Sequence, residues 1–415
     1  MFLHQLRAVK SLQDTSISAV VKTAGIWDST FPHPHNSLLS TAILHPVFST
    51  LMGMDNIVWE VRIVDVIVFA FIPLMLYEIY TNFFDRRTSF LSVCLFMFFP
   101  LFYDEMVVIA ARTGFAILFV SLFMLVVFSN ELDLAKRKFL AILFAFSIIT
   151  SHYGTAYIFM FILVFASFIM YLGRKFHLMK NKPFTTLSTC ALYFALSFSW
   201  YSYTSSASNF GLLTGYTKHI LTHLSEFLQP TSSATMRAVT TTWASLSIEI
   251  TKYLIFVSIF FILIGILKHT YFKGKRTFSD EYTIFSVLFF LVLFLLLLPR
   301  TTGALRIYAI SLILTAPFSV VGLSVILKWF NLDDSKKQLI AFSIFLLAFL
   351  SFSTGIVANA INFATGDIVD FSICFPTDIK KIQESNNFEC KWLVYWAYRP
   401  DSTIEATLWL LRYHN

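Results

Sequence analysis

FMFFPLFYDEMVVIAARTG, residues 96–114, is the stretch from which the fold can be worked out. Two apolar runs meet here, and the acidic pair Asp104 and Glu105 lies between them. A helix that crosses a bilayer needs about 20 apolar residues. Ionisable residues are costly at membrane depth, so they usually mark a pathway or a site. The stretch therefore predicts a connection between two membrane helices that carries chemically active groups.

The composition of the whole chain indicates an integral membrane protein. Its 415 residues are 57% hydrophobic and 13% charged, with a mean hydropathy of +0.71, whereas soluble domains carry about 25% charged residues. The formal net charge of +7 would suggest a nucleic-acid partner in a soluble protein. Here Lys and Arg in cytoplasmic loops account for it. We therefore expect an all-α protein in the lipid bilayer, with no nucleic-acid partner.

Apolar runs recur along the chain and predict about ten transmembrane helices. They are 57–79, 89–103, 107–129, 139–151, 155–172, 185–205, 248–267, 281–298, 305–327 and 338–359. The predicted organisation is a leading segment 1–56, a polytopic domain 57–359 and a tail 360–415. The tail mixes aromatic and charged residues, which suits either the start of a small soluble domain or an interfacial cap.

Basic residues gather in alternate loops, which sets the orientation in the cell membrane. Loops rich in Lys and Arg face the cytoplasm. This rule places the connection at Asp104 and Glu105 outside, together with 1–56 and 360–415. The basic loops contain Arg86 and Arg87; Lys136, Arg137 and Lys138; Arg174, Lys175, Lys180 and Lys182; Lys268, Lys273, Lys275 and Arg276; and Lys328, Lys336 and Lys337.

The segments predicted outside have features of their own. Residues 37–54 and 211–228 read as amphipathic helices that lie along the interface. Cys374 and Cys390 in the tail either form a disulfide, which an extracytoplasmic tail would allow, or remain free thiols. An extracytoplasmic segment 1–56 has no preceding helix to lead it across the membrane. We therefore expect that a first span is missing, through truncation, a late start codon or a split gene.

Asp104 and Glu105 are the first candidates for catalysis. Two adjacent carboxylates suit a divalent cation such as Mg²⁺ or Mn²⁺, and either one suits a general base. The alternative is that an acid caps the helix that follows. Arg112 is the expected counter-ion of this pair or a ligand for a phosphate. Near the outer end of 57–79, Arg62 and Asp65 have the spacing of a structural ion pair.

Three further groups are candidates for ligand binding. Asp28, His33 and His35 have the chemistry of a Zn²⁺ or Mn²⁺ site, the alternative being a solvated loop. His152, at the end of a short span, suits a phosphate contact or a packed interfacial imidazole. Arg300 and Arg306 suit a phosphate or diphosphate clamp, the alternative being snorkelling to the interface. The chain has no Walker motif, no GxGxxG and no HExxH.

The arrangement of outer acidic segments and amphipathic helices resembles the GT-C superfamily of multi-pass membrane glycosyltransferases. More specifically, it resembles an uncharacterised archaeal family of predicted membrane proteins of that general type. The phrases that carry this resemblance are PHNSLLSTAILHPVFSTLMGMD (34–55), YDEMVVIAART (103–113), SHYGTAYIF (151–159), RIYAISLILTAPFSVVG (306–322) and ECKWL (389–393).

The resemblance implies transfer of a sugar from a polyprenyl-phosphate donor outside the cell. Asp104 and Glu105 fit the second of the two acidic motifs of such enzymes, and Asp28 is the candidate for the first, the catalytic acid. Because that acid usually follows the first span, the resemblance implies that a chain without this span is an inactive fragment or half of a split enzyme. The alternatives are a transporter or lipid flippase, and a non-catalytic membrane subunit.

Overall fold

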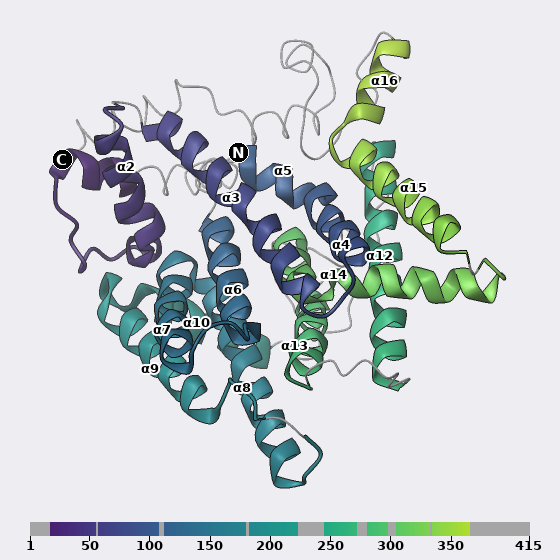
Figure 1. The fold of residues 1–415 in the computed structure, drawn as a ribbon. Coiled ribbons are helices and arrows are strands. Elements are labelled where there is room, and N and C mark those ends of the chain that lie inside the picture. Colours follow the sequence, from purple (N-terminus) through teal and green to yellow (C-terminus); the bar gives the residue numbers. More distant parts are fainter. Residues whose placement is uncertain are drawn as a thin grey trace.

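Every regular element in the described part of the chain is helical, as the sequence predicted. The computed structural model describes residues 17–54, 57–107, 112–179, 182–222, 245–271, 280–297, 304–332 and 334–365. Within these ranges there is no strand. Figure 1 shows helices of different tilt packed side by side, with the first short helices gathered at one edge.

Five helices in these ranges are long and apolar enough to cross a membrane. Each coincides with a predicted span, so the prediction of a membrane protein is supported by length and composition. The expected total of about ten is not reached by this count. The qualifying segments are Ile63–Thr81 of α3 (Ile57–Thr81), α8 (Tyr153–Lys175), Leu246–Thr270 of α12 (Leu246–Tyr271), Leu305–Trp329 of α14 (Ala304–Trp329) and α15 (Ser335–Ser353).

The other predicted spans form helices that are shorter, interrupted or more charged. The predicted span 89–103 is divided at Phe99, whose extended backbone separates α4 from α5. A residue before proline is pushed out of the helical region, and Pro100 follows. The elements that lie in or overlap the predicted spans and do not qualify are α4 (Arg86–Phe98), α5 (Pro100–Val107), α6 (Arg112–Phe128), α7 (Leu134–Ser151), α9 (Leu187–Tyr203), α13 (Asp280–Leu291), η5 (Val292–Leu297) and α16 (Ile356–Thr365).

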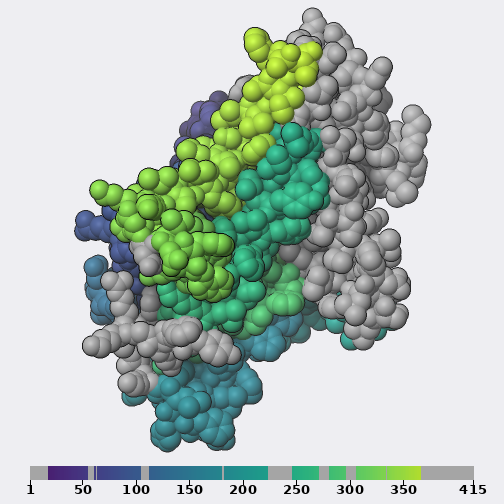
Figure 2. Space-filling model, turned by 90° about the vertical axis from the view of Figure 1, so that its right-hand side faces the viewer, coloured from purple at the N-terminus to yellow at the C-terminus, as the bar shows by residue number. Residues whose placement is uncertain are grey.

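Helix α14 is the centre of the packing. It contacts α3, α4, α5, α6, α12, α13 and α15, and 67% of its spanning window is buried. Its closest neighbour is α12. A Cβ added to Gly265 would lie 2.0 Å from the Phe318 carbonyl oxygen, and one added to Gly322 would lie 1.8 Å from that of Phe261. The two backbones therefore touch, as small residues allow in membrane helix pairs. Figure 2 shows α15 and α16 lying over α12 on one face.

Residues 17–54, which we name the N-terminal cap, cover the ends of α7, α8 and α9. The indole of Trp27 stacks on that of Trp200 with centroids 6.3 Å apart. The Trp200 indole N–H donates to the Ser37 carbonyl oxygen at 2.9 Å, and the Ser40 hydroxyl donates to that of Ser151 at 3.2 Å. The cap is thus fixed to the end of the bundle where the predicted outer loops lie.

The predicted amphipathic helix 37–54 is helical but divided into pieces. They are the end of η1 (Pro34–Ser37), the π-helix η2 (Ser40–Leu44) and α2 (His45–Leu51). Pro46 lies in the first turn of α2, where its missing N–H costs no intrahelical bond.

The second predicted amphipathic helix, 211–228, corresponds to α10 (Ser208–Thr222) as far as the described residues reach. Cys374 and Cys390 lie outside the described residues, as does most of the tail.

Candidate functional site

His152 joins α7 to α8 without an intervening loop. It is the C-cap of α7 and the N-cap of α8, with an extended backbone. Its Nδ1 accepts the Thr155 backbone N–H at 3.2 Å and lies 2.9 Å from the Thr155 hydroxyl. Because Nδ1 is an acceptor in the first of these bonds, this hydrogen-bond pattern assigns the proton of the neutral ring to Nε2. A Cβ on Gly154 would lie 3.1 Å from the imidazole Cε1, which favours glycine beside it.

Three basic side chains lie close enough to this imidazole to act on it electrostatically. Burial lowers the pKa of His152 well below its usual 6.5, and Arg112, Arg306 and His35 lower it further through their charges. We call His152 together with these three basic residues the cationic cluster. The predicted substrate-binding residues Arg112, His152 and Arg306 thus lie together. Arg300, the fourth, lies outside the described residues.

The cationic cluster is built from the ends of elements that are far apart in the sequence. Arg112 begins α6, Arg306 lies in the first turn of α14, and His35 is buried within η1. Arg112 and Arg306 lie within the predicted spans 107–129 and 305–327, near their outer ends, and His35 lies in the segment 1–56 predicted outside. Helix N-termini carry a partial positive charge, so the starts of α6, α8 and α14 add to the positive potential. The arrangement suits an anion.

Asp104 and Glu105 lie within α5, beyond its first turn. Helix α5 packs against α3, α4 and α14, so its backbone is held beside the helix that carries Arg306. Neither acid caps the start of α5. The two side chains, and residues 108–111, lie outside what the structure describes, so their pairing with Arg112 stays a prediction.

Asp28 is an exposed residue that orders its own loop. Its Oδ1 accepts the Thr30 hydroxyl at 2.7 Å and the Thr30 backbone N–H at 2.9 Å. These two bonds lower the pKa of Asp28 below its usual value. A carboxylate with a lowered pKa is a weak general base. The observed geometry is therefore that of a turn-forming aspartate.

His33 and His35 lie in edge contact, with ring centroids 4.9 Å apart. The Nδ1 of His33 accepts the His35 backbone N–H at 3.2 Å and caps η1. Among the side chains that the structure describes, no group of three or more His, Cys, Asp or Glu is placed to hold a metal ion. A metal at this pair would need further ligands.

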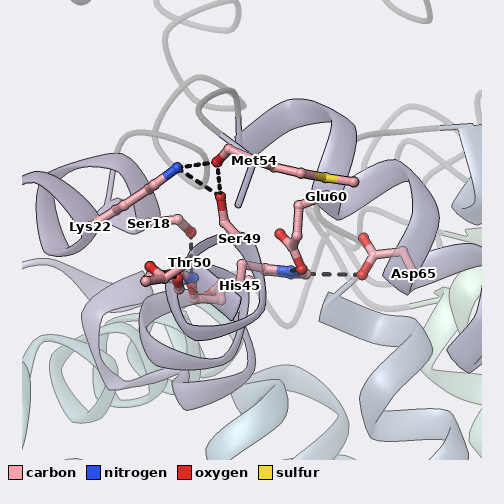
Figure 3. Close-up of polar contacts among 10 residues, drawn as sticks. Ser18, Lys22, His45, Ser49, Thr50, Met54, Glu60 and Asp65 are labelled. Carbon is pink, nitrogen blue, oxygen red and sulfur yellow. Dashed lines mark hydrogen bonds and ion pairs between the residues drawn. The ribbon is translucent and has the colours of Figure 1, made fainter. Parts of the chain in front are cut away.

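A second polar cluster, which the sequence did not single out, lies beneath the N-terminal cap. His45 is buried between Glu60 and Asp65 of α3. Its Nδ1 lies 3.3 Å from Glu60 Oε1, and its Nε2 lies 3.6 Å from Asp65 Oδ1 (Figure 3). Because the two ring nitrogens point apart, one cation cannot be bound by all three residues. The arrangement instead fits a polar clamp in which His45 of α2 joins the two acids of α3.

The clamp lies close to the cationic cluster. The His45 ring meets the edge of Phe115 with centroids 5.9 Å apart, and Phe115 lies one turn beyond Arg112 on α6. η2, which ends before His45, also packs against α6 and α7. Segments of π-helix occur frequently at functional sites. The clamp therefore positions the cap that supplies His35.

A lysine anchors the other edge of the cap. The Lys22 ammonium donates to the Ser49 hydroxyl at 2.8 Å and to the Met54 carbonyl oxygen. Ser49 also donates to Met54 at 2.8 Å, and Ser18 donates to the Thr41 carbonyl oxygen at 2.6 Å (Figure 3). These bonds fold residues 17–54 back on themselves, so α2 is held where His45 meets α3.

The sequence predicts a pairing of Asp65 with Arg62 rather than the clamp. The Arg62 side chain is not described, and Asp65 faces His45. The available signal was a histidine beside a proline in an otherwise apolar run, ILHPVF (43–48), near two acids at the start of a span. That signal does not show which acid the histidine meets.

Comparison with known proteins gives a family without an activity. No curated protein matches the chain. Residues 137–412 match a family described as Predicted membrane protein (DUF2206). The match includes His152 and Arg306 and extends over more than half of the sequence. The chain therefore belongs to the DUF2206 family of predicted membrane proteins.

Proposed function

We propose that this membrane protein is a GT-C-like glycosyltransferase that takes its sugar from a polyprenyl-phosphate donor on the extracytoplasmic face. The observation that carries the proposal is the cationic cluster. Arg112, Arg306 and His35 lie around a neutral His152 at one end of the helical bundle. This set of side chains fits a phosphate at membrane depth.

The chemistry of the cluster favours a phosphate over a simple counter-ion. Arginine offers planar, bidentate hydrogen bonding to phosphate oxygens. The Nε2–H of neutral His152 adds a donor of fixed direction, because Thr155 holds the other ring nitrogen. A partly buried site strengthens these interactions relative to water. A lipid-linked phosphate reaches such a site from the bilayer with its chain still in lipid.

The acids on α5 supply the remaining roles. Helix α5 packs on α14, so we assign metal or donor-phosphate binding, and the base, to Asp104 and Glu105. Mg²⁺ or Mn²⁺ is the fitting metal, since both prefer oxygen ligands. The lowered pKa of Asp28 argues against the base role first expected for it. Arg300 remains a proposed second phosphate ligand.

The proposal includes the topology. The shorter and interrupted helices would complete about ten crossings of the cell membrane, with outer amphipathic helices in the cap and α10. Residues 1–56 and 360–415 would be extracytoplasmic. The basic connections before α4, α7, α9, α13 and α15 would then be cytoplasmic.

Binding of dolichyl phosphate to the purified protein in nanodiscs, measured by native mass spectrometry, tests the phosphate site. We expect Arg112→Gln and Arg306→Gln to weaken binding about tenfold or more. Arg86→Gln, which removes an exposed charge at the start of α4 in a predicted cytoplasmic loop, is the control. Equal binding by all three variants would remove the basis of the proposal.

Sugar transfer in membranes tests the activity itself, with Asp104→Asn as the inactive variant. Transfer by this variant at the wild-type rate would contradict the assignment of the acids. The interruption between α4 and α5 favours one alternative, a transporter or flippase, because broken helices often line transport sites. Lipid flux in proteoliposomes without a transfer product would support that alternative. Binding with neither activity would indicate an inactive remnant or a non-catalytic subunit.

A further inference from the structure

A large cavity lies at the end of the bundle opposite the cationic cluster. Its volume is about 770 Å³, which is the size of a small-molecule site. It is open on one side and is lined by the end of α6, the N-terminal parts of α7, α9 and α13, and residues 182–184. These elements begin or end in the basic loops, so the cavity lies where the membrane meets the predicted cytoplasmic side.

The inner wall of the cavity is fixed by its own contacts. Glu281 accepts the backbone N–H of Phe184 at 3.0 Å and that of Thr185 at 2.9 Å. The Arg137 guanidinium lies over the Phe184 ring, 4.4 Å from its centroid, and donates to the carbonyl oxygens of Val126 and Val127. Glu281 and Arg137 are thus used in holding the wall together.

Lys138 and Lys182, which are both exposed, supply the remaining positive charge of the lining. The half-buried Asp280 is its other acid. Hydroxyl groups at the start of α9, including that of Ser188, lie along the same rim. The charged rim therefore has two lysines against one aspartate that is not part of the wall contacts. This balance favours a headgroup with negative charge.

The opposite part of the lining is apolar and would face lipid in the topology proposed above. Ala141 and Ala145 of α7 and Tyr193 of α9 form its floor. Ile142 is 45% exposed and Leu192 is 41% exposed at its edge. Exposed Ile and Leu on membrane helices face acyl chains. One cavity thus joins a cationic rim to an apolar slot between α7 and α9.

A neighbouring groove extends the positive rim. Its volume is about 530 Å³, and it shares Pro183, Thr186 and Ser188 with the first cavity. Arg174 and Lys175, in the last turn of α8, line it, and no acid does. The segment 182–188 is therefore bordered by basic side chains on both sides. Basic pockets between membrane helices on this side attract anionic headgroups.

We propose that this cavity binds an anionic phospholipid. The phosphate lies at Lys138 and Lys182, and one acyl chain lies between α7 and α9 along Ile142 and Leu192. Charge complementarity selects the headgroup, and the lateral opening selects a ligand that comes from the bilayer rather than from solution. The site is independent of the proposed transferase activity, because it lies at the other end of the helices.

Native mass spectrometry of the full chain in detergent tests the proposal, with added phosphatidylglycerol, phosphatidylcholine or inorganic phosphate. The wild type should retain phosphatidylglycerol and release phosphatidylcholine. The double variant Lys138→Gln/Lys182→Gln should bind phosphatidylglycerol roughly 30-fold more weakly, the loss expected for two charges at a headgroup. Lys336→Gln/Lys337→Gln, which removes two exposed charges in the first turn of α15, should bind as the wild type does.

Three results would overturn the proposal. Equal losses in the two double variants would show that general surface charge is responsible. Equal retention of the two lipids would remove the selection by charge. Displacement of the lipid by millimolar inorganic phosphate would identify a site for soluble phosphate. Both substituted pairs are exposed, so each variant should keep the fold. Thermal unfolding of each variant measures whether it does.

Discussion

The Tyr80 hydroxyl lies 3.0 Å from the carbonyl oxygen of Ile313, which Pro317 leaves without its helical donor. A proline has no N–H, so the carbonyl four residues before it has no intrahelical partner. Tyr80 is fully buried and lies 3.0 Å from the Leu312 carbonyl oxygen as well. A side chain of α3 thus satisfies the backbone of the central helix α14.

Tyr80→Phe should lower the free energy of unfolding by about 1–3 kcal/mol, the usual cost of leaving a buried carbonyl without a donor. Thermal unfolding in detergent measures the loss. Tyr203→Phe is the control, because Tyr203 is 84% exposed. Equal unfolding temperatures for the two variants would show that the Tyr80 hydroxyl contributes nothing.

Gly322→Ala should prevent the close approach of α12 and α14. The added Cβ would lie 1.8 Å from the Phe261 carbonyl oxygen, so the helices would have to separate, at a cost of about 1–3 kcal/mol or more. Gly215→Ala in α10 is the matched control, since its Cβ meets nothing within 4 Å and alanine favours a helix. An unfolding temperature for Gly322→Ala at or above that of the control would contradict the close approach of α12 and α14.

The neutral His152 predicts a stability that falls in acid. Its pKa is lowered in the folded protein, so the unfolded chain binds the proton first. The free energy of unfolding should therefore decrease as the pH falls below about 6.5. His152→Asn keeps a good N-cap and removes this titration. Its unfolding temperature between pH 7 and 5 should change less than that of the wild type, and parallel curves would exclude His152 as the cause.

His45→Ala should release the N-terminal cap. Two buried carboxylates, Glu60 and Asp65, would lose their shared partner, a loss that typically costs about 3–5 kcal/mol. Hydrogen exchange should rise across residues 17–54, while α12 and α14 remain protected. Val47→Ala, a change at a side chain that is 45% exposed on α2, is the control. Unchanged exchange in the cap of His45→Ala would show that the clamp does not hold it.

The apolar runs predicted the positions of the helices because burial in lipid demands continuous hydrophobic sequence. The division at Phe99 was readable from Pro100 but was missed, since the apolar run continues through it. The sequence does not predict that Arg112, Arg306 and His35 lie near His152, because no residue pattern tells which helix ends meet. The local neighbours of His35 predict a metal site, because Asp28 and His33 are close in the sequence. The sequence does not predict the clamp at His45 either, because it does not show which acids this histidine meets.

No loop residue separates α7 from α8 at His152. A single residue ends α7 and begins α8, so a change in the angle between the two helices would also turn the imidazole. A ligand that fixes the ring would also stiffen the hairpin along its whole length. Occupancy at one end of the bundle would then be readable at Leu134 and Lys175, the far ends of the two helices.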